Sequence, residues 1–138
     1  MASDVLHFAA AHGDLEKCRE LLSHGHNVND VDELGYTPLH YAAMKEQIEA
    51  AKLLLAAGAN VNARDERTIG HTPLGEIADN CSLAMARLLV EAGADPSIRG
   101  WMQICALDLA VSRRRGDGPT IYKLLRASAK HLPARHSP

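Results

Sequence analysis

Apolar residues recur at helical spacing in short runs along this chain, and polar turns separate the runs. Leu15, Cys18, Leu21 and Leu22 form one apolar stripe among Asp, Glu, Lys and Arg residues. A second stripe runs from Ile48 to Leu55. Residues three and four positions apart share one face of a helix, so each stripe predicts an amphipathic helix.

The residues at the ends of these runs predict where helices begin and stop. Thr37 can cap the free N–H groups of a first helical turn, and Pro38 occupies the first helical position, where its missing N–H costs nothing. Gly58 follows the second stripe, as expected for a residue that tolerates the left-handed conformation at a helix end. Residues 59–70 are rich in Asn, Asp and Gly and predict a turn-bearing connection. The pattern is therefore helix, turn, helix, loop.

This pattern occurs four times. The phrase LHFAA at Leu6–Ala10 returns 33 residues later as LHYAA at Leu39–Ala43. The phrase GYTPL returns 35 residues later as GHTPL at Gly70–Leu74, and Leu107 follows Leu74 by a further 33 residues. The glycines that end the second helices keep the same spacing of 33 and 35 residues: Gly25, Gly58 and Gly93. Such a period is typical of repeat proteins whose units stack into one domain.

The phrases DELGYTPLHYAA (Asp32–Ala43) and LLLAAGANVNARD (Leu53–Asp65) resemble an ankyrin repeat. The resemblance covers about residues 3–128. It implies an all-α solenoid of antiparallel helix pairs, with β-hairpin loops that project roughly at right angles and a concave surface. We expect a single ankyrin repeat domain over residues 1–138, in which unit 1 is an N-terminal cap and unit 4 a C-terminal cap. The predicted units are 3–31, 32–64, 65–99 and 100–128, followed by a tail at 129–138.

Units 3 and 4 depart from the family pattern. Unit 3 has two extra residues before Gly70, which predicts a longer loop tip, and Gly75 stands where the family has His. Unit 4 replaces the Thr-Pro-Leu-His phrase with Cys105–Asp108. Its turn between helices, Ser112–Pro119, is two residues longer than in the other units. We expect unit 3 to be the weak link of the stack.

Composition narrows the class of protein. Hydrophobic residues make up 46% of the chain, but aromatic residues only 4%, which suits small, closely packed helices. No apolar run approaches the roughly 20 residues that span a bilayer, and the N-terminus lacks the pattern of a secretory signal. The three cysteines are widely spaced, which indicates reduced thiols. We expect a cytoplasmic protein, or a nuclear one in a eukaryotic cell. Met1 and the cap-like ends favour a complete small protein over a fragment of a larger scaffold.

The charges are unevenly distributed. Residues 100–138 carry seven Lys or Arg residues against Asp108 and Asp117, a balance of +5. The rest of the chain has 8 basic and 15 acidic residues, a balance of −7. The run Arg113–Arg115 could contact an acidic partner or be simply solvated. Because the whole chain is mildly acidic and lacks aromatic residues between its basic ones, we expect no nucleic-acid partner.

Thr37 and His40 could be read as a catalytic pair or as a piece of structure. Histidine titrates near neutral pH and is common in proton transfer. No carboxylate in the phrase would orient the ring, however. The resemblance implies a structural His, whose ring bonds the Thr hydroxyl and nearby loop backbone and so joins one unit to the next. We expect this role for His40 and also for His7.

Other catalytic or metal-binding patterns are weak. His24 and His26 form a close pair, but a zinc site needs a second pair of ligands. Neither Cys81 nor Cys105 has a nearby His that would generate a thiolate, and no phosphate-binding loop is present. We therefore expect no enzyme activity, no cofactor and no bound metal; a small metal-binding or hydrolytic protein is the alternative.

The family's partner-binding positions fall on the loop tips and on the exposed side of each first helix. Several large apolar side chains occupy these positions, although loops do not need them to fold, and this indicates an interface. Trp and Tyr are also enriched in binding hot spots. Alternatively, Trp101 and Met102 fold down to cover the end of the stack. We expect a monomer that binds another protein and no membrane. The candidate residues are Leu34, Tyr36, Met44, Lys45, Ile69, His71, Asp79, Asn80, Trp101, Met102, Ile104 and Arg113, with Glu33, Thr68 and Ser112 beside them.

Asn29 and Asn62 each follow a valine, with a leucine eight positions earlier. This resembles the site that asparaginyl hydroxylases modify in many ankyrin repeats, if the source cell is eukaryotic. Alternatively, both side chains make turn hydrogen bonds, and this second interpretation is the one we favour.

Overall fold

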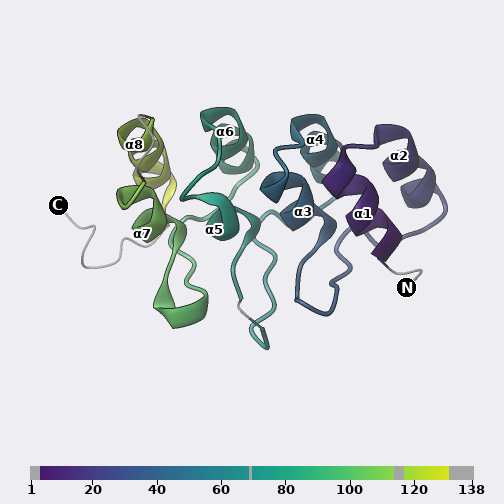
Figure 1. Ribbon diagram of the computed structural model, residues 1–138, viewed down its shortest axis with the longest axis horizontal. Helices are drawn as coiled ribbons and strands as arrows, with labels where there is room; N and C mark the ends of the chain where they lie inside the picture. Colours follow the sequence, from purple (N-terminus) through teal and green to yellow (C-terminus); the bar gives the residue numbers. More distant parts are fainter. Residues whose placement is uncertain (1–3, 69, 114–116, 131–138) are drawn as a thin grey trace.

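Eight α-helices stack in two rows in the computed structural model, which describes residues 4–68, 70–113 and 117–130 (Figure 1). Each unit contributes one helix to each row. The first row contains α1 (Val5–His12), α3 (Pro38–Met44), α5 (Pro73–Ile77) and α7 (Ala106–Val111). The second row contains α2 (Leu15–Ser23), α4 (Ile48–Ala56), α6 (Leu83–Glu91) and α8 (Gly118–Ser128). The two rows run side by side along the molecule, with the helices of units 1 and 4 at its opposite ends.

Each unit packs against its neighbours. Within the first row, α1 contacts α3, α3 contacts α5, and α5 contacts α7; the second row is linked in the same order. Ala10, Ala43 and Ala78 are at most 1% exposed, and these small side chains let consecutive first helices approach closely. The predicted all-α solenoid is confirmed. Its loops project from one side of the helices as narrow turns in which the described residues form no β-strand.

The helix ends match the sequence signals. Pro38 and Pro73 open α3 and α5, and the Thr72 hydroxyl accepts a hydrogen bond from the N–H of Gly75 at 3.0 Å. In each of units 1 to 3 a glycine lies shortly after the second helix and adopts a left-handed conformation. The φ angles are 89° for Gly25, 95° for Gly58 and 99° for Gly93. Glycine adopts this conformation without the steric cost of a side chain, which explains its fixed place in the repeat.

Unit 4 keeps the helix pair with different capping chemistry. Where unit 2 has Thr37 and His40, unit 4 has Cys105 and Asp108. The Cys105 N–H donates to Asp108 Oδ2 at 2.9 Å, which closes the first turn of α7. In the loop before α7, Trp101–Gln103 form a short 3-10 turn, η2.

Among the described residues, no helix is both long enough and apolar enough to cross a membrane.

Candidate partner-binding surface

His40 is a structural link between units 2 and 3. Its ring is completely buried, and Nε2 donates to the backbone carbonyl of His71 at 2.8 Å. Nδ1 accepts a hydrogen bond from the Thr37 N–H at 3.0 Å and lies 2.9 Å from the Thr37 hydroxyl. Burial lowers the pKa of His40 to about 4, so the ring is neutral at pH 7. A buried neutral ring with both nitrogens engaged is out of reach of a substrate, which favours the structural interpretation.

His7 makes the equivalent link from unit 1 to unit 2. It is 4% exposed, and its Nε2 lies 2.9 Å from the carbonyl oxygens of both Asp30 and Tyr36. Unit 3 has no such ring because Gly75 occupies the position. The loop residue His71 fills part of the space, since a Cβ on Gly75 would lie 3.5 Å from its Nδ1.

The Asn29 and Asn62 side chains link the turns that follow the second helices of neighbouring units. Asn62 donates from Nδ2 to the Gly93 carbonyl at 3.1 Å, and its Oδ1 accepts from the Asp95 N–H at 2.8 Å. Asn29 makes the same pair of bonds one unit earlier, to the Gly58 carbonyl and the Asn60 N–H. These contacts support the turn-bonding interpretation of both residues.

The loop tips of units 2, 3 and 4 are held against one another. Gly35 has a φ of +82°, and a Cβ at this position would lie 2.4 Å from Thr68 Oγ1 in the next loop. Arg64, in the loop that leads to α5, donates to the Arg99 carbonyl in the loop that leads to α7. Loops in such close contact present their outer side chains on a fixed surface.

A hollow of about 450 Å³ lies across these tips. It brings together Leu34 and Tyr36 of unit 2 and Trp101 of unit 4. Leu34 and Trp101 are 61% and 60% exposed, so the hollow has apolar walls that open to solvent. The remaining lining residues are Glu33, Arg67 and Thr68.

Both the hydroxyl and the ring of Tyr36 contact neighbouring side chains, which hold Tyr36 in place. Its hydroxyl donates to Glu76 Oε1 at 2.9 Å, and its ring centroid lies 5.2 Å from that of His40. Burial, together with the hydrogen bond to Glu76, raises the pKa of Tyr36 to about 12. The phenol therefore stays protonated at physiological pH and holds the ring at the edge of the hollow.

Trp101 does not fold down over the end of the stack, because it is 60% exposed and lines the tip hollow. Met102 is 68% exposed and has a left-handed φ of 57°, which is uncommon for a residue with a side chain. It contributes instead to a groove at the end of unit 4, as does the half-buried Ile104.

The other predicted residues are placed as follows. Met44, Lys45, Asp79 and Asn80 are exposed at the ends of α3 and α5. His71 is half-buried and packs against Gly100, where a Cβ would lie 2.4 Å from its Nδ1. Ile69 lies outside the described residues.

Arg113 was predicted to face a partner, but the structure buries its side chain. Its side chain is 0% exposed. The guanidinium donates to the carbonyls of Ala78 at 3.0 Å and Cys81 at 2.8 Å, and to Asp117 Oδ1 at 2.7 Å. Arg113 therefore ties the turn of unit 4 to the turn of unit 3. Arg114 and Arg115 lie outside the described residues.

Reasoning from the sequence alone missed Arg67 as a lining residue of the tip hollow. Its guanidinium makes two 3.0 Å hydrogen bonds to Asp65, which fixes its position. The two extra residues of the unit 3 loop were the available signal, because they extend this tip beyond its neighbours.

The described residues offer little for metal binding or nucleophilic chemistry. They contain no group of three or more His, Cys, Asp or Glu side chains that could hold a metal ion. Cys18, Cys81 and Cys105 are free and buried. Burial raises the pKa of each thiol, and that of Cys81 to about 11, so all three are protonated at neutral pH.

Comparison with known families agrees with this architecture. A family model described as ankyrin repeats (3 copies) matches residues 6–100. The chain belongs to the ankyrin repeat family. Ankyrin repeats are generally protein–protein interaction modules and are typically non-catalytic. Unit 4 lies beyond the matched residues, although its helices pack on unit 3 in the same way as the others. A search of curated proteins finds no match.

Proposed function

We propose that this ankyrin repeat protein is a non-catalytic binding module that holds a partner protein on its loop tips and concave surface. The observation that carries the proposal is the tip hollow, where Leu34, Tyr36 and Trp101 converge from two different units. Exposed apolar side chains gathered in one place are typical of interaction sites, and Trp and Tyr supply much of the binding energy at many interfaces.

The rigidity of the tips supports this role. Thr68 lies against Gly35, and Arg64 bonds the neighbouring loop at Arg99, so the loops have little freedom to lose on binding. A preformed surface loses less conformational entropy in the complex, and a few anchors can then suffice. The hydrogen bond from Tyr36 to Glu76 extends this rigidity to α5.

The exposed ends of α3 and α5 would extend the surface away from the tips. Met44 and Lys45 end unit 2's first helix, and Asp79 and Asn80 follow that of unit 3. Charge of both signs at these positions would set the orientation of the partner more than its affinity. Because the three cysteines are free thiols, we propose a cytoplasmic setting for the complex.

Affinity capture from the source cell tests the proposal. The wild-type protein and a Leu34→Asp/Trp101→Asp variant serve as paired baits. The matched control is Arg87→Asp, because Arg87 is exposed on α6 in the second row of helices. We expect the wild type and Arg87→Asp to retain the same protein and the tip variant to lose it, with all three equally helical by circular dichroism. Equal retention by all three baits would contradict the tip surface.

A further inference from the structure

The end of unit 4 is built differently from the ends of units 1 to 3. In the first helices, Ala10, Ala43 and Ala78 are at most 1% exposed, whereas the equivalent Val111 is 59% exposed. The second helices show the same change, because Cys18, Ala51 and Ala86 are 0% exposed and the equivalent residue of α8 is the larger, half-buried Tyr122. At two positions where units 1 to 3 have small residues that face the next unit, unit 4 thus has larger residues.

This replacement disfavours a further ankyrin unit at the usual spacing. The small residues let neighbouring helix pairs pack closely, and adding side-chain volume to such an interface forces the helices apart. Arg126 adds a charge one helical turn after Tyr122, where unit 2 has Leu55 and unit 3 has Val90. A helix pair that follows the repeat pattern would have to bury this charge.

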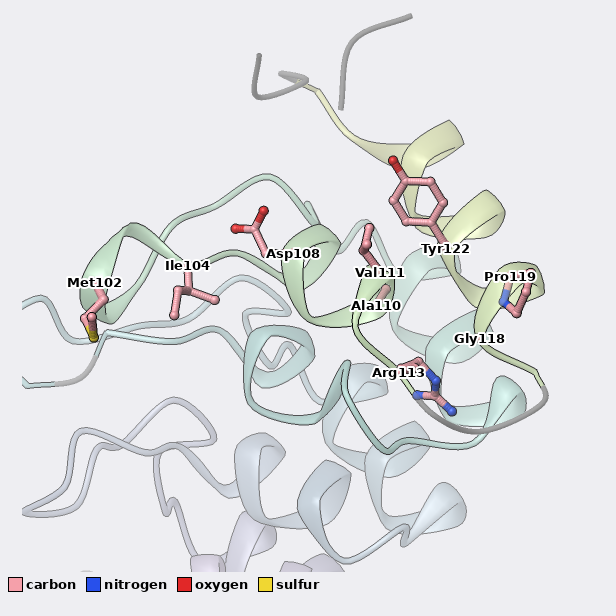
Figure 2. A pocket seen from close by; sticks show the side chains of 9 residues that line it. All are labelled: Met102, Ile104, Asp108, Ala110, Val111, Arg113, Gly118, Pro119 and Tyr122. Carbon is pink, nitrogen blue, oxygen red and sulfur yellow. The ribbon is translucent and has the colours of Figure 1, made fainter. Parts of the chain in front are cut away.

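The same end nevertheless carries an apolar groove of about 780 Å³ (Figure 2). Met102 and Ile104 line it from the loop before α7, Val111 from the end of α7, and Pro119 and Tyr122 from α8. Val111 and Met102 are more than half exposed, so the groove opens to solvent. A single amphipathic helix is narrower than a helix pair and can lay its apolar face in a groove of this kind.

The charges around the groove favour an acidic occupant. Asp108 lines the groove and has its charge directed to the Cys105 N–H, from which it accepts a hydrogen bond at 2.9 Å, and Asp117 pairs with Arg113 at 2.7 Å. Helix α8 contains Lys123 and Arg126 and no acidic residue. Over the described residues 100–113 and 117–130, four basic residues stand against Asp108 and Asp117, which acts in the same direction.

We propose that this end groove, lined by Met102, Ile104, Val111, Pro119 and Tyr122, is a second binding site that takes a short amphipathic helix of a partner protein, apolar on one face and acidic on the other. The site is separate from the tip hollow in its lining, since Met102 and Val111 do not line that hollow. Complementary charge would speed encounter and fix the direction of the helix.

The probe that tests the proposal is a fluorescein-labelled peptide of about 16 residues, with leucines on one helical face and glutamates on the other. A twin peptide with lysines in place of the glutamates tests the charge. Fluorescence anisotropy with the full chain should give saturable binding of the acidic peptide, at least about tenfold tighter than that of the basic twin. This preference should shrink as salt is added and in an Arg126→Gln variant.

Two variants test the place of binding. Val111→Ser removes the two exposed methyl groups of Val111. Met102→Asn replaces an apolar side chain by a polar one, and Asn is chosen because it tolerates the left-handed conformation. Each should weaken the acidic peptide several-fold. Val31→Ser, at a valine 43% exposed between α2 and α3, is the matched control and should bind as the wild type does. Leu34→Asp should also leave peptide binding unchanged, because Leu34 lines the tip hollow. A failure of the proposed tip surface can therefore be distinguished from a failure of the proposed groove site.

Three results would overturn the proposal. One is equal binding of the acidic and basic peptides, and another is unchanged binding by both groove variants. The third is a different occupant: a dimer in sedimentation velocity that Val111→Ser dissolves, or a free peptide of the sequence HLPARHSP that binds as tightly as the acidic probe.

Discussion

His40 joins two repeat units through one hydrogen bond, from its Nε2 to the backbone carbonyl of His71 at 2.8 Å. The ring is buried, and its Nδ1 accepts the Thr37 N–H at the start of α3. One side chain thereby closes a helix end and fixes the loop of the following unit. This arrangement explains how a Thr and a His can stand side by side without forming a catalytic pair.

Replacing His40 by Ala should lower the free energy of unfolding by on the order of 1–3 kcal/mol, because the His71 carbonyl and the Thr37 N–H lose their buried partner. Urea titration measures the loss. We expect partner affinity to be kept under conditions where the variant is folded. Unchanged stability would contradict the structural role of the ring.

The same residue should make stability depend on pH. The pKa of His40 is about 4 in the folded chain, below its ordinary value of 6.5, so the unfolded chain binds a proton more readily. Stability from the neutral ring is complete above pH 6.5 and is lost as the pH falls toward 4. Urea titrations between pH 7 and pH 4 should show this decline, and it should be smaller in His40→Asn. An identical decline in wild type and variant would assign the effect to other groups.

Arg113→Ala should destabilise the chain, although the residue stands in a run of three arginines. The substitution leaves the Ala78 and Cys81 carbonyls without their donor and Asp117 without its ion-pair partner. Each buried acceptor left unpaired costs on the order of 1–3 kcal/mol. Lys123→Ala, at an exposed basic residue of α8, is the matched control and should change the thermal midpoint little. Equal midpoints for the two variants would show that the Arg113 contacts do not stabilise the fold.

Units 3 and 4 should open more readily than units 1 and 2. Gly75 weakens α5, which has only five residues, by about 1 kcal/mol relative to Ala, and unit 3 lacks the linking His. Stability in a repeat stack is roughly a sum of unit and neighbour terms. Hydrogen exchange should therefore be faster in α5 and α7 than in α1 and α3, whereas uniform protection along the stack would contradict this.

Local sequence signals predicted most of the fold because they act within one unit. Thr37, Pro38 and Gly58 each mark a helix end through their own local chemistry, and the repeat period then predicts the stack. Arg113 could not be placed in this way. Whether an arginine in a turn is solvated or buried depends on which carbonyls the neighbouring unit leaves unpaired, and the sequence does not reveal that.

The candidate site was predicted in part. Leu34, Tyr36 and Trp101 were expected at the tips from their motif positions, and the three residues line one hollow. The packing of His71 on Gly100 was not foreseen, because it depends on the space that Gly75 leaves. The groove at the end of unit 4 was not foreseen either, because it depends on how α7, α8 and the loop before α7 pack together.

Calorimetric titration of the captured partner into wild-type and Trp101→Ala protein tests the tip surface most directly. Trp101 lines the tip hollow and is 60% exposed, so its removal should leave the helical circular dichroism intact. We expect binding to weaken by roughly 2 kcal/mol or more, as for a hot-spot tryptophan. Unchanged affinity in a folded variant would contradict the account and place the interface elsewhere, and unfolding of units 3 and 4 would make Trp101 a structural residue of the cap.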